Sequence, residues 1–326
     1  MFSTDLRPRV PEVDRASAQS TSGTVSAKSV ENTSDPLRVQ SRVADFLTLT
    51  KVRVNTLVVA TTVGGYYIAT SGAINVVTLL NTCLGTALVA GGAAALNQVS
   101  ERDIDRLMER TRMRPVADSR MSVAEAAAFS SAITALGLLM LWIGSGALSA
   151  LVALATFLSY AFVYTPLKRV TTLATIVGAV PGALPPLIGW AAARGSLSDP
   201  APWALFLIGF FWQLPHILAV GWMYRDDYAR AGLPMLAVVD TTGAITGRQA
   251  VLWAAALIPV SLLPSASPIH LTGMVYIIGA FALGLMQLAL AITFARQRSS
   301  ANARRLFYAT LIYLPLLWGL MIVGRR

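Results

Sequence analysis

The segment from Asn97 to Pro115, NQVSERDIDRLMERTRMRP, follows a long apolar run and is crowded with charge. Within it, Asn97, Glu101 and Asp105 recur at intervals of four residues. If the helix continues past the apolar run, these three side chains share one face. Two carboxylates and an amide supply the oxygen ligands that Mg²⁺ prefers, and bound Mg²⁺ commonly bridges carboxylates to substrate phosphates. The spacing therefore indicates a cation site.

Arginines stand beside these acids. Arg102, Arg106 and Arg110 form a neighbouring stripe with the same spacing, and the planar guanidinium group suits phosphate oxygens. Acids next to arginines indicate a site that binds a phosphate ester together with its metal ion. The alternative is a solvated helix end with i,i+4 ion pairs, in a loop that is basic for topological reasons. That alternative does not explain Asn97 at the membrane edge or the second charged cluster.

The second cluster lies in residues 211–236, FWQLPHILAVGWMYRDDYARAGLPML, where Asp226 and Asp227 stand near Arg225 and Arg230. Four apolar runs separate the two clusters, an even number, so both are expected on the same membrane face. Around a shared cavity, the two sets of acids could hold two divalent ions and a diphosphate. Metal ions and fixed cations would stabilise the charge that grows on this leaving group as its C–O bond breaks. A membrane would hold a long allylic tail, which ionises readily, so the site suits prenyl transfer.

The overall composition indicates that a membrane positions these residues. The chain of 326 residues is 55% hydrophobic, only 13% charged and has a mean hydropathy of +0.61. Soluble domains carry about 25% charged residues, so this composition argues against a single soluble domain. The formal charge of +10 fits the basic cytoplasmic loops of membrane proteins, and we expect no nucleic-acid partner. Cys83 is the only cysteine, which excludes an intrachain disulfide and a cysteine-based metal site.

Nine apolar runs are long enough to cross roughly 30 Å of hydrocarbon and predict an all-α membrane protein with nine transmembrane helices. The runs lie near 54–70, 76–97, 122–143, 147–165, 172–193, 203–222, 248–265, 272–294 and 305–323. Lys and Arg gather in alternate loops, which places the N-terminus in the cytoplasm and the C-terminus outside.

The first residues differ from the rest. Residues 1–44 are predicted to form a disordered cytoplasmic tail, and residues 45–326 the membrane domain, because the start is rich in Ser and Thr without apolar periodicity. No apolar segment typical of a secretory signal occurs there. Residues 1–36 carry four basic and five acidic groups, which argues against a mitochondrial precursor and for a bacterial inner membrane.

Several motifs together make residues 45–323 resemble the protohaem IX farnesyltransferase (haem O synthase) family of the UbiA superfamily of intramembrane prenyltransferases. The matching strings are LTKVRV (49–54), NQVSERDIDRLMERTRMRP (97–115), YTPLKR (164–169), GAVPGALPPLIGW (178–190) and WQLPH…W…DY…AGLPML (212–236). The acidic motif by itself would indicate only the superfamily. PGALPPLIGW and DDYARAGLPML favour the haem-modifying branch.

The resemblance implies a UbiA-type bundle of nine helices around a central cavity, capped by cytoplasmic loops. The implied reaction joins the farnesyl group of farnesyl diphosphate to a vinyl group of haem B, with water supplying a hydroxyl group. The products would be haem O and diphosphate, and Mg²⁺ would be the cofactor. Haem O would pass to terminal oxidases, directly or after conversion to haem A, so haem A synthase and oxidase assembly proteins are implied partners.

The resemblance also assigns roles to residues. The implied metal ligands are Asn97, Glu101, Asp105, Asp226 and Asp227. The implied diphosphate contacts are Lys51, Arg53, Arg110, Arg114 and Lys168. The implied catalytic set is Asn97, Glu101, Asp105, Lys168 and His216, and Tyr164, Trp212 and His216 would contact haem or the prenyl chain. Three residues depart from the family pattern: Glu101 replaces Asp, Val52 replaces Pro, and Ala174 replaces Asn.

His216 has two interpretations. An ionisable residue inside an apolar span is a functional candidate, and it could contact haem iron, contact a haem propionate or orient water. It could instead be a neutral histidine bonded to a backbone carbonyl. The spacing alone favours the structural interpretation, and the resemblance favours the functional one. The other histidine, His270, is assigned no role.

Other candidates also have plainer alternatives. Pro181, Pro185 and Pro186 interrupt the run 172–193 and predict a break that lines a cavity, with a simple packing kink as the alternative. Tyr164 and Lys168 could be an interfacial aromatic and a lysine that sets topology. Trp212 could stack on the porphyrin or anchor the helix at the interface.

Two other functions compete with haem farnesylation. One is a UbiA-type enzyme that prenylates an aromatic quinone precursor, which would need a compact polar pocket instead of a broad apolar slot. The other is a transporter or haem-binding membrane protein without catalysis. Transporters concentrate charge near the membrane midplane, whereas the charge here lies at one edge, which favours an enzyme.

Overall fold

The structure, a computed structural model, describes residues 42–266 and 268–325 of the chain. Residues 1–41 of the predicted tail, which comprises residues 1–44, lie outside the described residues, and residues 42–44 belong to a helix. The predicted membrane domain begins at residue 45, whereas the first described helix already begins at Arg42. The described residues form no β-strand, and one isolated bridge joins Thr272 to Arg325.

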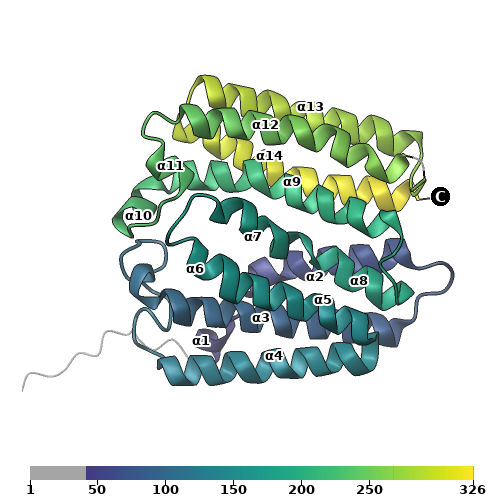
Figure 1. Cartoon of the computed structure of the whole chain (residues 1–326), viewed down its shortest axis with the longest axis horizontal. Coiled ribbons are helices and arrows are strands. Elements are labelled where there is room, and N and C mark those ends of the chain that lie inside the picture. Colours follow the sequence, from purple (N-terminus) through teal and green to yellow (C-terminus); the bar gives the residue numbers. More distant parts are fainter. Residues whose placement is uncertain (1–41, 267, 326) are drawn as a thin grey trace, which may run out of the picture. The chain divides into compact units, whose positions relative to one another are not determined.

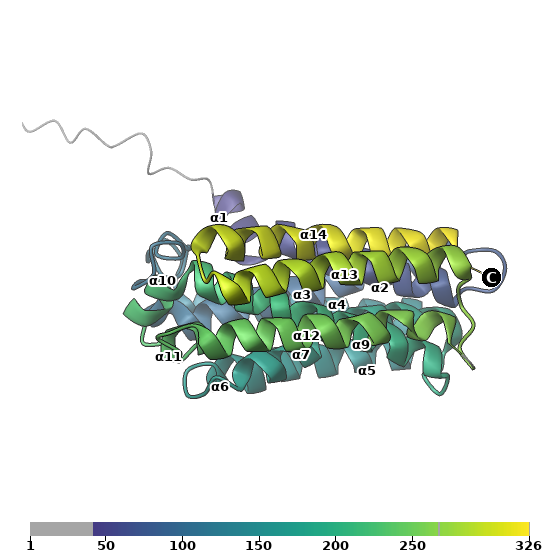
Figure 2. The same ribbon diagram turned by 90° about the horizontal axis from the view of Figure 1, so that it is seen from above.

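Long helices that run side by side make up this part of the chain (Figures 1 and 2). The elements are α1 (Arg42–Leu49), α2 (Val52–Ala69), α3 (Val76–Asp105), α4 (Val123–Ser145), α5 (Ala147–Leu158), the π-helix η1 (Ser159–Tyr164), α6 (Thr165–Leu167), α7 (Ala174–Ala183), α8 (Pro185–Arg194), α9 (Pro200–Met223), α10 (Arg225–Arg230), α11 (Leu236–Val239), α12 (Ala244–Leu262), the 3₁₀ helix η2 (Leu263–Ser265), α13 (Met274–Arg296) and α14 (Ser300–Val323).

The described residues contain eight helical segments long and apolar enough to cross a membrane. A ninth is obtained when α1 and α2, which meet at a bend of 47°, are taken together as one span. The predicted first run, 54–70, corresponds to α2 (Val52–Ala69). The chain is therefore an all-α, multi-pass integral membrane protein, as the hydropathy pattern predicts.

One span is broken at Leu184, where α7 ends and α8 begins. Pro185 and Pro186 open α8, a position where the missing N–H of proline costs no helical hydrogen bond. Both prolines and Gly182 line a small cavity, so the prediction of a cavity-lining break is confirmed for Pro185 and Pro186, whereas Pro181 lies inside α7 and is not part of the cavity wall.

Two glycines bring α2 and α8 into backbone contact next to this break. A Cβ atom on Gly189 would overlap the carbonyl oxygen of Thr62, and one on Gly65 would overlap that of Pro186. Small residues allow membrane helices to approach this closely and to pack without the hydrophobic effect that acts in water. The crossing fixes α2, and with it the turn that carries Lys51.

The loops after α3 and after α9 meet at one end of the bundle. Met108 from the first loop forms a buried apolar cluster with Ala231 and Leu233 from the second. In Figure 1 these loops and α10 lie at the opposite end from the C-terminus. We refer to the end formed by residues 98–121 and 224–243 as the charged end. Its composition confirms that the two charged clusters emerge on the same side.

Candidate functional site

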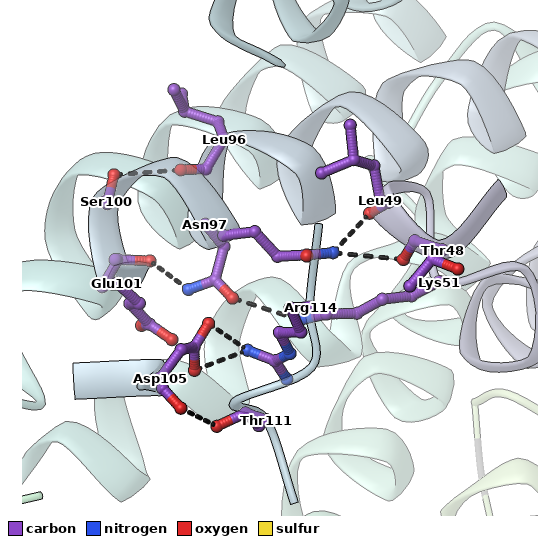
Figure 3. A network of polar contacts seen from close by, with 12 residues as sticks. Thr48, Leu49, Lys51, Leu96, Asn97, Ser100, Glu101, Asp105, Thr111 and Arg114 are labelled. Atoms are coloured by element: carbon purple, nitrogen blue, oxygen red, sulfur yellow. Dashed lines mark hydrogen bonds and ion pairs between the residues drawn. The ribbon is translucent and has the colours of Figure 1, made fainter. Parts of the chain in front are cut away.

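The predicted acidic face of α3 is present and buried. The helix continues to Asp105, and Asn97, Glu101 and Asp105 are 2%, 2% and 0% exposed. Figure 3 shows their side chains gathered on the same side of α3. Buried carboxylates are strongly unfavourable unless charges and hydrogen bonds compensate them, so their partners decide what the site can do.

A different cation reaches each of these three residues. Lys51 Nζ donates to Asn97 Oδ1 at 3.1 Å, and Lys168 forms an ion pair with Glu101. Arg114 Nη1 donates to the two carboxylate oxygens of Asp105, at 2.8 and 2.7 Å. The three cations come from the α1–α2 turn, the end of α6 and the loop after α3. The fold thus brings four of the predicted catalytic residues into contact with two residues that were predicted only to bind the diphosphate. These are Asn97, Glu101, Asp105 and Lys168, with Lys51 and Arg114.

A glutamine holds the turn that presents Lys51. The backbone of Lys51 is left-handed, with φ of 49°, which lets the chain turn sharply between α1 and α2. Gln98 Nε2 donates to the carbonyl oxygens of Thr48 and Leu49, both at 3.1 Å. Sequence reasoning missed Gln98, although it directly follows Asn97 in the acidic motif.

The loop that carries Arg114 is held by polar contacts of its own. Thr111 Oγ1 donates to the carbonyl of Asp105 at 2.9 Å, and Arg120 Nε donates to Asp45 of α1 at 3.1 Å. Asp45 is only 2% exposed, so α1 anchors the far side of the loop. These contacts keep Arg114 over the end of α3.

The predicted arginine stripe is wrong. Because α3 ends at Asp105, Arg106 turns back and donates through Nε to the carbonyl of Ala117 at 2.7 Å. Arg102 is exposed and pairs with its neighbour Asp103. Arg110 lies in the loop beyond the end of α3, and its guanidinium lies 5.3 Å from the centre of the Tyr224 ring.

The π-helix η1 supplies aromatic residues to the site. The Tyr164 ring lies 5.9 Å from Lys168 Nζ and covers Gly178, where a Cβ atom would overlap it. Tyr160, one turn earlier, has its ring centre 5.5 Å from that of Tyr164. π-Helical turns often occur at functional sites, because the extra residue redirects side chains. Tyr164 was a predicted substrate contact, whereas Tyr160 was missed.

Thr165 is a second residue that sequence reasoning missed. Its hydroxyl accepts from Asn97 Nδ2 at 3.4 Å and donates to the carbonyl of Tyr160 at 2.9 Å. This contact orients the Asn97 amide so that its oxygen faces Lys51. Thr165 stands inside the YTPLKR motif, but nothing in the spacing distinguishes it from the other residues there.

The two acids of α10 differ strongly in exposure. The side chain of Asp226 is 88% exposed and lies 3.7 Å from Arg225, whereas that of Asp227 is 12% exposed and pairs with Arg230. Next to them, burial raises the pKa of the Tyr228 phenol above its ordinary value, and the positive charge of Arg110 opposes this shift. Of the two acids, only Asp227 is largely buried within the charged end.

The donor set on α3 fits Mg²⁺. Among the described residues, no group of three or more His, Cys, Asp or Glu side chains is close enough to form a metal site unaided. Glu101 Oε1 is fully enclosed and has no hydrogen bond besides its ion contact with Lys168. Two carboxylates and an amide are too few for an all-protein cage, but Mg²⁺ typically takes few carboxylates, keeps waters and binds substrate phosphates. The acids of α10 stay predicted ligands.

The aromatic candidates on α9 face α14. Trp212 Nε1 donates to the carbonyl of Thr310 at 2.8 Å, and His216 Nδ1 lies 2.8 Å from the Thr310 hydroxyl. The histidine partner is therefore a hydroxyl group, not the backbone carbonyl of the structural alternative.

Three other sequence expectations concern single positions. Arg53 is exposed and forms no ion pair within residues 42–266 and 268–325, and its diphosphate contact stays a prediction. Val52 begins α2 and is 50% exposed, so its replacement of proline leaves no gap in the core. Ala174, 2% exposed at the start of α7, removes the polar group that an asparagine would place there.

A small cavity of about 80 Å³ lies between α2, the α7–α8 break, α9 and α14. Its wall includes Leu57, Thr61, Pro186, Trp212, Leu314 and Trp318. Sites for drug-sized ligands occupy about 300–1,000 Å³, so a prenyl chain or a porphyrin would require these apolar side chains to move apart.

Comparisons with known proteins agree with this architecture. Residues 58–317 match the UbiA prenyltransferase family. A protein from Solibacter usitatus (strain Ellin6076), named protoheme IX farnesyltransferase, is 43% identical over 290 residues, which cover 86% of this chain and 98% of the relative. One of the same name from Aquifex aeolicus (strain VF5) is 40% identical over 289 residues, covering 87% and 96%.

Solved structures share the fold at low sequence identity. A digeranylgeranylglyceryl phosphate synthase superposes with a TM-score of 0.72 at 17% identity, over 86% of this chain and 98% of the other. A UbiA homolog from Archaeoglobus fulgidus bound to GPP and Mg²⁺ superposes with a TM-score of 0.59 at 15% identity, over 85% and 99%. Given the family match across residues 58–317 and relatives that align over nearly their full length, the chain belongs to the UbiA prenyltransferase family.

Proposed function

We propose that this protein transfers the farnesyl group of farnesyl diphosphate to a vinyl group of haem B, giving haem O and diphosphate. The relatives from Solibacter usitatus and Aquifex aeolicus that align over nearly their whole length are named protoheme IX farnesyltransferase. In the reaction, the C–O bond of the diphosphate ester breaks and its electrons leave with the diphosphate. A C–C bond forms to one vinyl carbon, water adds its oxygen to the other, and a proton is released.

The observation that carries the proposal is the buried acid face of α3, with one cation on each of its three residues. Asn97, Glu101 and Asp105 would hold Mg²⁺, with Asp227 as a further ligand from the second cluster. When bound, Mg²⁺ would offset the charge that grows on the diphosphate as the C–O bond breaks. Such a site explains why buried acids and buried cations occur together.

The cations have a second role in this proposal. Lys168 and Arg114 pair with the two acids and Lys51 donates to the Asn97 amide, and all three cations would bind the phosphate oxygens when the metal takes over the carboxylates. Arg53, in the first turn of α2, and Arg110, at the charged end, are both exposed and would reach the outer phosphate.

The apolar part of the reaction would occur deeper in the bundle. The face of Tyr164, already within 5.9 Å of the Lys168 ammonium, would stabilise positive charge on the allylic carbon. The chain could shift aside the side chains around the small cavity to admit the farnesyl tail. This arrangement keeps the ionising carbon away from bulk water.

We further propose that the charged end faces the cytoplasm of a bacterial cell, with the N-terminus on that side. Basic loops in membrane proteins lie predominantly on the cytoplasmic side, and farnesyl diphosphate is a charged, water-soluble substrate. Haem A synthase or proteins that assemble terminal oxidases would receive the product.

Product analysis tests the reaction directly. Membranes containing the protein are incubated with haem B, farnesyl diphosphate and Mg²⁺, and extracted haems are analysed by HPLC and mass spectrometry. We expect a new haem heavier by one farnesyl group plus water, absent with EDTA and absent in Asp105→Asn membranes. Farnesyl transfer to an aromatic acid instead would indicate a quinone-precursor prenyltransferase. Transfer to neither acceptor would contradict enzymatic function.

A further inference from the structure

α14 holds His216 in one tautomer. The Thr310 hydroxyl has a single hydrogen, which it donates to the carbonyl of Phe307 at 2.6 Å. In its 2.8 Å contact with His216 Nδ1 the hydroxyl must therefore accept. The hydrogen of the neutral imidazole is thus on Nδ1, and Nε2 keeps a free electron pair.

The imidazole is also held in one orientation. Its ring stacks on Trp212 at 5.2 Å with an angle of 21°, and its other neighbour, Phe307, lies at 5.0 Å. Trp212 is itself tied to α14 by its bond to the carbonyl of Thr310. No hydrogen bond to Nε2 occurs within the described residues, and Nε2 is not among the enclosed polar atoms without partners.

This geometry is the one that metal-binding histidines use. Such a histidine donates from one ring nitrogen to a fixed acceptor, which sets the tautomer and the ring plane, and binds the metal through the other nitrogen. A histidine needed only for packing would gain nothing from an unpaired Nε2 inside a membrane span. The arrangement therefore indicates a ligand that accepts an electron pair.

The surroundings of His216 suit a flat, apolar ligand with acidic groups at one edge. Trp212, one turn before His216, lines the small cavity together with Leu314 and Trp318 of α14, whereas His216 itself is not part of the cavity wall. Arg304 lies on the same stripe of α14, three residues before Phe307, and is exposed. At 1.5 Å per residue it is about 9 Å from Thr310 along the helix, towards the charged end. No ion pair or hydrogen bond of the Arg304 side chain occurs within residues 42–266 and 268–325.

We infer that His216 binds the iron of the haem substrate through Nε2, and that Arg304 binds one haem propionate at the membrane edge. This inference rests on the proposed function, which supplies haem B as the acceptor. Imidazole is a common axial ligand of haem iron, and a carboxylate at the porphyrin edge needs a cation near water. The porphyrin would lie on the Nε2 side of the imidazole, away from the Thr310 contact, so that the orientation of His216 sets which edge of the ring faces the allylic carbon.

Haem titration of the purified full-length protein in lipid nanodiscs tests the iron ligand. Ferric haem B is added, and absorption and electron paramagnetic resonance spectra report its ligation. His216→Ala should lose the histidine-ligated spectrum, and added imidazole should restore it. His270→Asn is a matched control, because the chain has only these two histidines and asparagine tolerates the φ of 48° at residue 270. It should keep the wild-type spectrum.

Two further variants separate ligation from packing. Thr310→Val should lower the affinity for haem roughly tenfold, because the Nδ1–H group loses its acceptor. Arg304→Gln should weaken the binding of haem B but not of its dimethyl ester, which has no propionate charge. Arg296→Gln, at an exposed arginine that ends α13, should affect neither.

The outcomes distinguish this inference from the proposed function. Binding of haem by His216→Ala with the wild-type spectrum and affinity would overturn the iron ligand and leave the haem acceptor standing. Equal effects of Arg304→Gln on haem B and its dimethyl ester would overturn the propionate contact. A wild-type protein that binds no haem would overturn the inference and the haem acceptor together. If His216→Ala is poorly folded, His216→Gln with imidazole titration gives the same test.

Discussion

Arg114 donates hydrogen bonds to both carboxylate oxygens of Asp105, and the acid is fully buried while 18% of the arginine side chain remains exposed. The pair closes the loop that follows α3 onto the end of that helix. Because part of the Arg114 side chain is exposed and Asp105 is enclosed, the arginine can exchange its contact with Asp105 for one with an incoming phosphate. The same contact therefore compensates the buried charge of Asp105 and places Arg114 where it would meet the diphosphate.

Asp105→Asn should abolish most farnesyl transfer but leave the fold intact. The amide oxygen can still accept from Arg114, whereas the charge that would hold Mg²⁺ is lost, so we expect a fall of about 100-fold or more. Asp105→Ala should also unfold more easily, since removal of one partner from a buried ion pair costs about 3–5 kcal/mol. Haem product and thermal unfolding of the purified proteins measure the two effects. Full activity of Asp105→Asn would rule out Asp105 as a metal ligand.

The two acids of α10 should respond differently to the same change. Asp227→Asn should raise the Mg²⁺ concentration needed for half-maximal activity, because this side chain is only 12% exposed. Asp226→Asn should change it little, because this side chain is 88% exposed. Titration of activity with Mg²⁺ in both variants is the measurement. A larger effect at Asp226 would reverse the assignment.

Metal and diphosphate should stabilise the protein only together. Lys168 and Arg114 pair with the two acids and Lys51 donates to Asn97, so Mg²⁺ by itself competes with three cations for these ligands. With the Mg²⁺–diphosphate complex at about 100 times its dissociation constant, we expect about 2.7 kcal/mol of added stability. Thermal unfolding in Mg²⁺, in inorganic diphosphate, in both and with EDTA measures this coupling. Equal stabilisation by diphosphate with EDTA present would contradict a metal-bridged site.

The crossing of α2 and α8 should not tolerate a side chain. Gly189→Ala would place a methyl group on the carbonyl oxygen of Thr62 and force the helices apart. Overpacking of this kind costs about 1–3 kcal/mol, and the displaced α2 would also move Lys51. Gly319→Ala is the matched control, because nothing lies within 4 Å of its Cβ position and alanine favours helix. Thermal unfolding in nanodiscs should fall for the first variant and not for the second.

Much of the architecture followed from local patterns. The apolar runs predicted the membrane spans, because hydropathy is a property of the sequence. The even number of runs between the two charged clusters then predicted that both clusters lie on the same side of the membrane. The four-residue spacing predicted the shared face of Asn97, Glu101 and Asp105, which the helix up to Asp105 confirms. The prolines of the run 172–193 predicted the break that lines the cavity.

Tertiary packing decided which side chains meet. The arginine stripe failed at Arg106, because the chain left the helix there and the loop offered its carbonyls. The pairing of Lys168 with Glu101 and the difference between Asp226 and Asp227 depend on segments far apart in sequence. Helical periodicity determines the face on which a residue lies, but burial and partners depend on which helix packs against that face. The sequence by itself thus determined the spans, the motifs and the acid face, whereas only the tertiary structure decided the cation on each acid and the contact of His216 with α14.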